Sequence, residues 1–136
     1  MSEAKEELVR DWLLKAQGDL IAARKLAAEP DPRYDAALFH CQQAAEKAVK
    51  GFLVLHDLRF EKTHDVGALL ERAAAIRADF SSLVEDGEFL SPYATAFRYP
   101  GQALAPTSEE FGEAYQAAER ICRFVVSTVP GSYRPT

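Results

Sequence analysis

The sequence predicts an all-α fold, an up-and-down bundle of four to five helices, on two observations. Apolar residues recur at helical spacing along most of the 136-residue chain. No stretch alternates apolar and polar residues in the manner of a half-buried strand, and no internal repeat or low-complexity tract interrupts the chain. The length suits a single domain, which we assign to residues 1–129, followed by a flexible C-terminal tail at residues 130–136.

The longest helical pattern spans residues 33–57, and we expect the other helices to pack around it. It contains no proline, and Gly51 is its one weak helix former. Successive residues placed about 100° apart put these apolar side chains on one face: Ala37, Cys41, Ala45, Ala48, Phe52 and Leu55. A polar ridge runs along the opposite face: Gln43, Glu46, Lys47 and Lys50. Phe39 falls at the edge of this ridge, where a solvent-facing aromatic ring suggests a partner surface.

A helix is expected on each side of this segment. The first spans residues 4–28 and is ended by Pro30 and Pro32. Its apolar stripe comprises Leu8, Trp12, Leu13, Ala16, Leu20, Ile21, Ala23 and Ala27. The third helix is short, begins at a Thr63 cap and ends near Arg77. Its apolar face comprises Val66, Leu69, Leu70, Ala73 and Ile76.

The fourth helical segment opens with Ser82 and Glu85, which have the spacing of a capping box. Gly87 and Pro92 lie within it, so we expect two pieces or a kink. Its apolar content comprises Leu83, Phe89, Leu90, Tyr93 and Phe97.

The last helix opens with a second capping box, Thr107 and Glu110, and ends by Val129. Its apolar face comprises Phe111, Tyr115, Ala118, Cys122 and Val125.

Composition narrows the function classes. The net charge of −5 argues against general nucleic-acid binding, which relies on many cations, although a local basic cleft remains open. No apolar run approaches the roughly 20 residues of a membrane span, and the N-terminus lacks a signal-type apolar stretch, so we expect a cytoplasmic protein without membrane contact. Cys41 and Cys122 fall at apolar helical positions and are expected to be reduced core thiols, not zinc ligands. The sequence has no phosphate-binding glycine loop, HExxH or G-x-S-x-G motif, and we expect neither a metal nor a cofactor.

The segment Arg98-Tyr99-Pro100-Gly101 has two interpretations. It is a helix stop whose arginine hydrogen-bonds the last carbonyls, or an arginine held at a rigid helix end and suited to a phosphate or carboxylate. Tyr93 and Tyr99 could then offer stacking surfaces to a base.

His64 and the polar ridge also have two interpretations each. His64 is a partly exposed polar residue, or a ligand-binding or catalytic histidine whose ring Asp65 orients. The ridge is a solvated helix face with Glu46 and Lys50 as an i,i+4 pair, or an anion site or partner face. In the second case Lys47 and Lys50 would add to a phosphate site.

Three phrases together resemble the HEPN domain family, whose name stands for higher eukaryotes and prokaryotes nucleotide-binding. They are ALFHCQQAAEKAVKGFL in the second helix, THD at the start of the third, and FRYPG at the end of the fourth. The resemblance implies a HEPN-like bundle of five helices that is usually a homodimer. It also implies a small nucleotidyltransferase as partner in a two-component, toxin–antitoxin-like system, with a nucleotide or RNA as possible ligand. Other members are proposed to be metal-independent ribonucleases.

The ribonuclease branch of this family has an arginine followed four to six residues later by a histidine, near the end of the fourth helix. Here Arg98 is followed at those offsets by Gln102, Ala103 and Leu104, so the acid–base partner is missing. Arg59 and His64 satisfy the spacing, but they lie between the second and third helices.

We therefore expect a non-enzymatic binding subunit that binds nucleotide or pairs with a nucleotidyltransferase. The predicted phosphate site consists of Arg98 and Tyr99, supported by Lys47, Lys50 and His64, and the predicted partner interface contains Phe39 and Gln43. Two alternatives remain: a metal-independent RNA endonuclease and a purely structural protein-interaction bundle.

Overall fold

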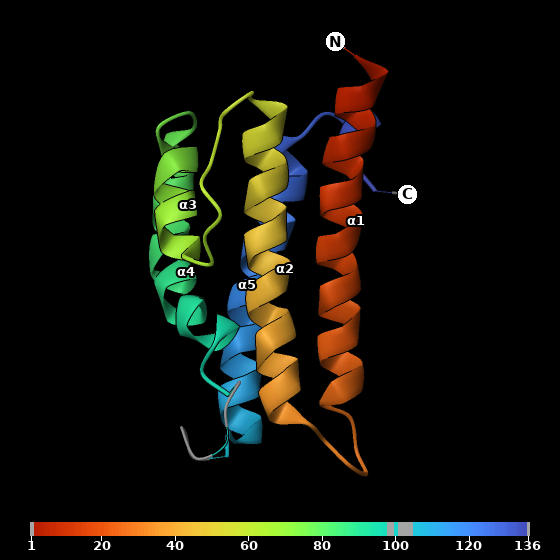
Figure 1. The fold of residues 1–136 in the computed structure, drawn as a ribbon, viewed down its shortest axis with the longest axis vertical. Helices are drawn as coiled ribbons and strands as arrows, with labels where there is room; N and C mark the ends of the chain where they lie inside the picture. Colours follow the sequence, from red (N-terminus) through yellow and green to blue (C-terminus); the bar gives the residue numbers. More distant parts are fainter. Residues whose placement is uncertain (1, 98–99, 101–104, 136) are drawn as a thin grey trace.

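The computed structural model describes residues 2–97, 100 and 105–135. Within them, five α-helices form one bundle and no residue belongs to a β-strand, which confirms the predicted all-helical class (Figure 1). The helices are α1 (Glu3–Leu26), α2 (Tyr34–Leu55), α3 (Val66–Ala74), α4 (Val84–Leu90) and α5 (Ser108–Thr128). Short 3-10 turns occupy Ala78–Leu83, Ser91–Ala94 and Gly131–Tyr133.

Helix α2 is the centre of the bundle, as its length and apolar face predict. Of its 22 residues, 14 are buried, because α1 lies on one side, α3 and α4 lie on the other, and α5 packs behind it (Figure 1). All six residues of the predicted apolar face are buried, and both cysteines are free thiols inside the core. Small side chains at Ala44, Ala45 and Ala48 let the neighbouring helices approach closely.

The apolar stripe of α1 differs in detail from the prediction. Leu8 and Ile21 are 49% and 38% exposed, whereas Val9 and Leu13 are buried. The buried line follows Val9, Leu13, Ala16 and Ala23, which lie four, three and seven residues apart and face α2. A wide apolar stripe does not by itself show which edge faces the neighbouring helix.

The connection between α2 and α3 runs back along α2 (Figure 1). Asp57 adopts a left-handed backbone with φ of 58°, and the N–H groups of Asp57 and Leu58 donate to the carbonyls of Val54 and Leu53. This is a Schellman ending, which reverses the chain direction. As a result α3 runs in the same sense as α2, an arrangement that departs from a simple up-and-down order.

Helices α3 and α4 pack closely through two glycines. A Cβ atom at Gly87 would lie 2.6 Å from Leu70 Cδ1 and 3.0 Å from the Gly67 nitrogen. A Cβ atom at Gly67 would lie 2.8 Å from Glu88 Cγ. Gly87 is therefore required for close packing. The fourth segment does form two pieces, as predicted, because α4 ends at Leu90 and a separate 3-10 turn contains Pro92.

Of the two predicted capping boxes, the one at Thr107 has the expected N-cap hydrogen bond, and the one at Ser82 does not form. The Thr107 hydroxyl accepts a hydrogen bond from the Glu110 backbone N–H at 3.0 Å, at the start of α5. The Ser82 hydroxyl instead donates to the Asp79 carbonyl, and α4 begins at Val84 without a side-chain cap. Ser82 is already inside a 3-10 turn, so its side chain bonds backward along the chain.

The described residues after Val129 do not form the frayed tail that we expected. Tyr133 is fully buried, and the Arg10 guanidinium donates to the Ser132 carbonyl. The segment thereby lies beside the N-terminal half of α1 (Figure 1). In the described part of the chain no helix combines the length and hydropathy needed to cross a bilayer.

The burial of Tyr133 predicts that the tail contributes to stability. Tyr133→Ala should lower the free energy of unfolding by about 3–5 kcal/mol, the usual cost of deleting a large buried aromatic side chain. Urea denaturation followed by circular dichroism measures this change. Ser132→Ala is the matched control, because its exposed side chain can be removed while its carbonyl keeps the Arg10 bond. An effect of Tyr133→Ala as small as that of the control would show that the tail is not part of the core.

Candidate functional site

The polar ridge of α2 is largely buried, so its interpretation as a solvated face is wrong. Gln42, Glu46 and Lys50 are 0%, 4% and 8% exposed, and Gln43 and Lys47 are half-buried. The reason is that the returning connection after α2 runs along this side of the helix and that α1 packs against its other edge (Figure 1). Periodicity within one helix does not show what the next connection will cover.

The Glu46 carboxylate is the centre of a hydrogen-bonded cluster. Its Oε2 accepts from Lys50 Nζ at 2.8 Å, and its Oε1 accepts from Gln42 Nε2 at 3.0 Å and lies 2.8 Å from His64 Nδ1. Gln42 Nε2 also donates to the His64 carbonyl at 3.0 Å, and Gln43 Nε2 donates to Gln42 Oε1 at 2.7 Å. These five residues form the Glu46 cluster, in which no buried side-chain oxygen or nitrogen lacks a partner.

The Lys50 ammonium is enclosed by aromatic rings as well as by the carboxylate. Its Nζ lies 5.5 Å from the centroid of the Phe60 ring and 6.0 Å from that of Trp12, both suitable for cation–π attraction. The two rings meet edge to face at 6.3 Å. Lys50 thus joins α1, α2 and the connection through internal contacts, and its charge is already paired.

His64 combines exposure with a fixed orientation. Its side chain is 58% exposed, and since Glu46 can only accept, Nδ1 must carry the proton that joins them. Nε2, the other ring nitrogen, forms no hydrogen bond with a described residue and is the available acceptor. Asp65, which we expected to orient the ring, instead caps α3 by accepting from the Ala68 N–H at 3.0 Å, in place of Thr63.

The electrostatics of the cluster favour the charged form of Glu46. Burial alone would raise the pKa of this carboxyl. The hydrogen bonds from Lys50, Gln42 and His64 and the charge of Lys50 outweigh burial and leave the pKa below its ordinary value of 4.5. Glu46 therefore stays ionised beside the exposed imidazole, and the Lys50 ammonium balances its charge.

A second ion-pair group joins α1 to the other edge of the ridge. The buried Asp19 carboxylate accepts from Lys47 Nζ at 2.8 Å, and its other oxygen lies 2.8 Å from His40 Nδ1. Lys47 is therefore also paired within the protein. Sequence reasoning missed Asp19 and Gln42, because a polar residue on an amphipathic helix gives no local sign of the partner that will bury it.

Aromatic side chains line a pocket beside the first turns of α2. Its volume is about 330 Å³, and its lining comprises Asp35, Ala36, Phe39, Tyr93 and Phe97. The Tyr93 and Phe97 rings stack with centroids 6.2 Å apart, and the Phe39 side chain is exposed, as predicted. Burial, with the hydrogen bond to Glu110, raises the pKa of the Tyr93 phenol, which stays protonated.

The predicted site residues fall into three groups. Arg98 and Tyr99, the main phosphate-site prediction, lie outside the described residues. Lys47 and Lys50 have buried carboxylate partners, and His64 and Gln43 belong to the Glu46 cluster. Phe39 lies four residues before Gln43 and therefore on the same side of α2, one turn away. Among the described residues, no group of three or more metal-ligating side chains converges.

Comparison with known proteins agrees with this five-helix arrangement. The crystal structure of TT1696 from Thermus thermophilus superposes with a TM-score of 0.73 at 30% identity, covering 89% of this chain and 98% of that one. The crystal structure of ST0689, an archaeal HEPN homologue, gives a TM-score of 0.71 at 29% identity, covering 90% and 98%. No match was found among curated proteins.

The fold and its buried polar cluster define a protein of the helical-bundle class. The family model of the HEPN domain matches residues 9–129. The chain belongs to the HEPN domain family, as the phrases in its second, third and fourth helical segments indicated.

The lowered pKa of Glu46 predicts how stability depends on pH. A folded-state pKa below 4.5 means that this carboxylate contributes fully above about pH 4.5 and less as the pH falls through the folded pKa. Glu46→Gln should lower the free energy of unfolding at pH 7 by about 3 kcal/mol, the cost of breaking a buried ion pair. Below about pH 4.5 the free energies of unfolding of the variant and the wild type should become more similar. Urea denaturation at a series of pH values measures it.

Glu119→Gln is the matched control. Glu119 and Arg123 are also spaced i,i+4, but their side chains are 33% and 79% exposed. The control should change stability by less than about 0.5 kcal/mol at every pH. A Glu46→Gln effect that is the same at pH 7 and pH 3.5 would contradict the charged, buried cluster.

Proposed function

We propose that the protein is a non-catalytic HEPN-type binding subunit that binds a nucleotide beside the N-terminal turns of α2 and pairs with a small nucleotidyltransferase. Its membership in the HEPN family supports this proposal. The observation that carries it is the exposed aromatic pocket formed by Phe39, Tyr93 and Phe97. Stacking on such rings is the sequence-tolerant way in which proteins hold a base.

An arginine follows the last pocket residue in the sequence. Phe97 lines the pocket, and Arg98 follows it directly in FRYPG. A guanidinium is well suited to a phosphate, because it offers a planar fork of donors. Lys47 and Lys50 already neutralise buried carboxylates, so they are poorly placed to supply that charge. The binding energy for phosphate should therefore depend strongly on Arg98.

The pocket and the Glu46 cluster form one continuous strip of α2. Phe39, Gln43 and Glu46 succeed one another at intervals of four and three residues, which spans roughly 10 Å along the helix axis. Phe39 is 37% exposed at one end of this strip, and His64 is exposed at the other. The strip is long enough to contact both a nucleotide and the edge of a partner protein, and we assign the partner interface to Phe39 and Gln43.

Substitution of Arg98 and Phe39 tests the binding function. Arg98→Ala should weaken binding of a fluorescent adenine nucleotide more than tenfold, since a charge-assisted contact is lost, and should leave the melting temperature nearly unchanged. Phe39→Ala should weaken the same binding by removing a stacking surface. Fluorescence anisotropy measures the affinity.

Arg59→Ala is the matched control, because it removes one exposed arginine far along the chain from the pocket. A fall in melting temperature with binding intact would show that Arg98 is a structural helix stop.

The partner interface is tested by co-purification with the nucleotidyltransferase encoded by a neighbouring reading frame, if that frame carries a G-S-x-x-x-G-x-x-x-x-S-D-type motif. Co-purification that survives Phe39→Ala would contradict the assigned interface.

A second candidate, metal-independent RNA cleavage, is favoured by one observation. His64 Nδ1 is held by a buried carboxylate while the side chain is 58% exposed, an arrangement that orients a histidine for proton transfer. Such a histidine could take the proton of an RNA 2′-hydroxyl as that oxygen attacks the adjacent phosphate. The bond from phosphorus to the 5′-oxygen of the next nucleotide breaks in this step, and the leaving oxygen takes a proton from water. Against this candidate, no histidine follows Arg98 at the spacing of the family's ribonucleases.

RNA cleavage by the purified chain decides between the two candidates. The binding-subunit proposal predicts no cleavage of a labelled RNA in EDTA at micromolar protein. Cleavage that His64→Ala abolishes, and that Glu46→Gln weakens while shifting its pH profile, would establish the endonuclease instead. Cleavage unaffected by His64→Ala would point to a contaminating nuclease, so the binding proposal would stand.

A further inference from the structure

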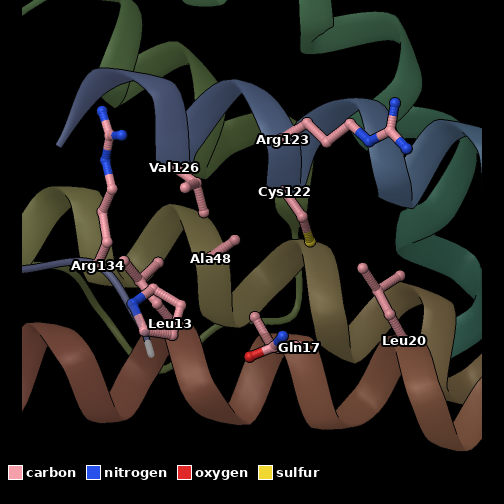
Figure 2. A pocket seen from close by; sticks show the side chains of 10 residues that line it. Leu13, Gln17, Leu20, Ala48, Cys122, Arg123, Val126 and Arg134 are labelled. Carbon is pink, nitrogen blue, oxygen red and sulfur yellow. The ribbon is translucent and has the colours of Figure 1, made fainter. Parts of the chain in front are cut away.

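A groove separates α1 from α5 on the side of α2 that carries Ala48 (Figure 2). Its volume is about 400 Å³, within the roughly 300–1,000 Å³ of pockets that bind small molecules. None of its lining residues belongs to the Glu46 cluster or to the aromatic pocket. The nucleotide and partner proposals above do not use it.

Small side chains produce the groove. Helices α1 and α5 each pack on α2 and touch one another little, so the space between them is floored by α2. At the floor, Ala48 and Ala16 are 1% and 2% exposed and too short to fill that space. The groove is therefore a consequence of the packing of three helices and needs no rearrangement to open.

The lining is apolar along its length. Leu13 and Leu20 from α1 lie across from Val126 and Cys122 from α5, and the amide of Gln17 lies between the two leucines (Figure 2). Cys122 Sγ contacts the Ala44 carbonyl at 3.5 Å, and burial raises the pKa of this thiol to about 12, so it stays neutral. An alkyl chain would replace water along this surface.

The charge at the groove has one sign, because its lining contains no acidic residue and two arginines. Arg123 extends along α5 away from α1 and lies 3.4 Å from Glu119, so it is already paired (Figure 2). Arg134 lies at the end of the groove, where its Nε donates to the Val129 carbonyl at 3.0 Å. Its two Nη groups form no hydrogen bond with a described residue and remain free to hold an anion.

We propose that this groove binds a small amphipathic carboxylate of the fatty-acid class. Its alkyl chain would lie between Leu20 and Val126, and its carboxylate would meet the Nη groups of Arg134. The apolar lining disfavours a nucleotide, which needs many more polar partners than Gln17 and Arg134 supply. The arginine at one end disfavours an alkylamine of the same length.

Titration of the full chain with decanoate, followed by isothermal calorimetry, tests this site. Decanoate should bind saturably, and decanol and decylamine at least tenfold more weakly. Arg134→Ala should weaken decanoate binding at least tenfold, whereas Arg134→Lys should weaken it less, because a lysine keeps the charge without the bidentate fork. Val126→Trp should abolish binding by placing a half-buried ring in the groove.

Arg59→Ala is the matched control for charge and should change the affinity less than twofold. The proposal is overturned if decanoate does not bind, if Arg134→Ala or Val126→Trp binds it as well as wild type, or if decylamine binds equally tightly. Sedimentation of wild type and Val126→Trp measures the oligomeric state and so tests whether a second copy of the chain occupies the groove instead. A dimer that Val126→Trp dissociates and decanoate leaves intact would show that a second copy of the chain covers the groove, which also overturns the proposal. Nucleotide binding at Phe39 and Arg98 is unaffected by any of these results, so the two sites fail independently.

Discussion

The buried carboxylate of Glu46 determines how the two halves of the bundle meet. A charge taken out of water must be compensated by hydrogen bonds and an opposite charge, and Glu46 obtains them from Lys50 and Gln42 on its own helix and from His64 on the connection. The connection must therefore return along α2 from Leu55 to the level of Glu46. That is about 14 Å of helix, a distance that eight or nine extended residues can cover. The parallel course of α3 follows from this return, and so does the place of α4 and the aromatic pocket.

The same side of α2 also fixes the register of α1. Lys50 lies against the Trp12 and Phe60 rings, and Lys47 reaches the buried Asp19 carboxylate. Such pairs add little net stability compared with apolar packing, but a register that separated them would leave buried charges without partners. A one-turn slip of α1 along α2 would break the Asp19 group. The alanine-rich face of α2 would tolerate a shift of α1 along the helix more easily. The polar side of α2 therefore fixes the register of α1, and the apolar side provides close packing.

Sequence periodicity predicted the fold well because long amphipathic helices carry their own signal. The segment expected at residues 33–57 is helical over Tyr34–Leu55, and the Thr107 cap begins α5 as predicted. Apart from the helix caps predicted at Ser82 and Thr63, the failures concern what lies opposite a helix. Whether Leu8 or Val9 faces α2, whether the Lys50 ridge is covered, and whether Tyr133 returns to the core depend on tertiary contacts between distant residues. At the candidate site, sequence identified Phe39 and His64 but not Gln42 or Asp19, because a polar side chain on a helix carries no local sign of its buried partner.

The distribution of charge explains why the two sites proposed here differ in kind. The net charge is −5. The sequence predicts Lys47 and Lys50 as phosphate ligands, but both form ion pairs with buried carboxylates. A polyanion would therefore find no extended basic surface on α2, and recognition of a nucleotide must rely on ring stacking with a single guanidinium. The groove between α1 and α5 differs, because its long lining is mostly apolar, contains no acidic residue and has Arg134 at one end. Because α2 presents Ala48 to that groove and paired charges to the other side, one helix separates an apolar site from a polar one.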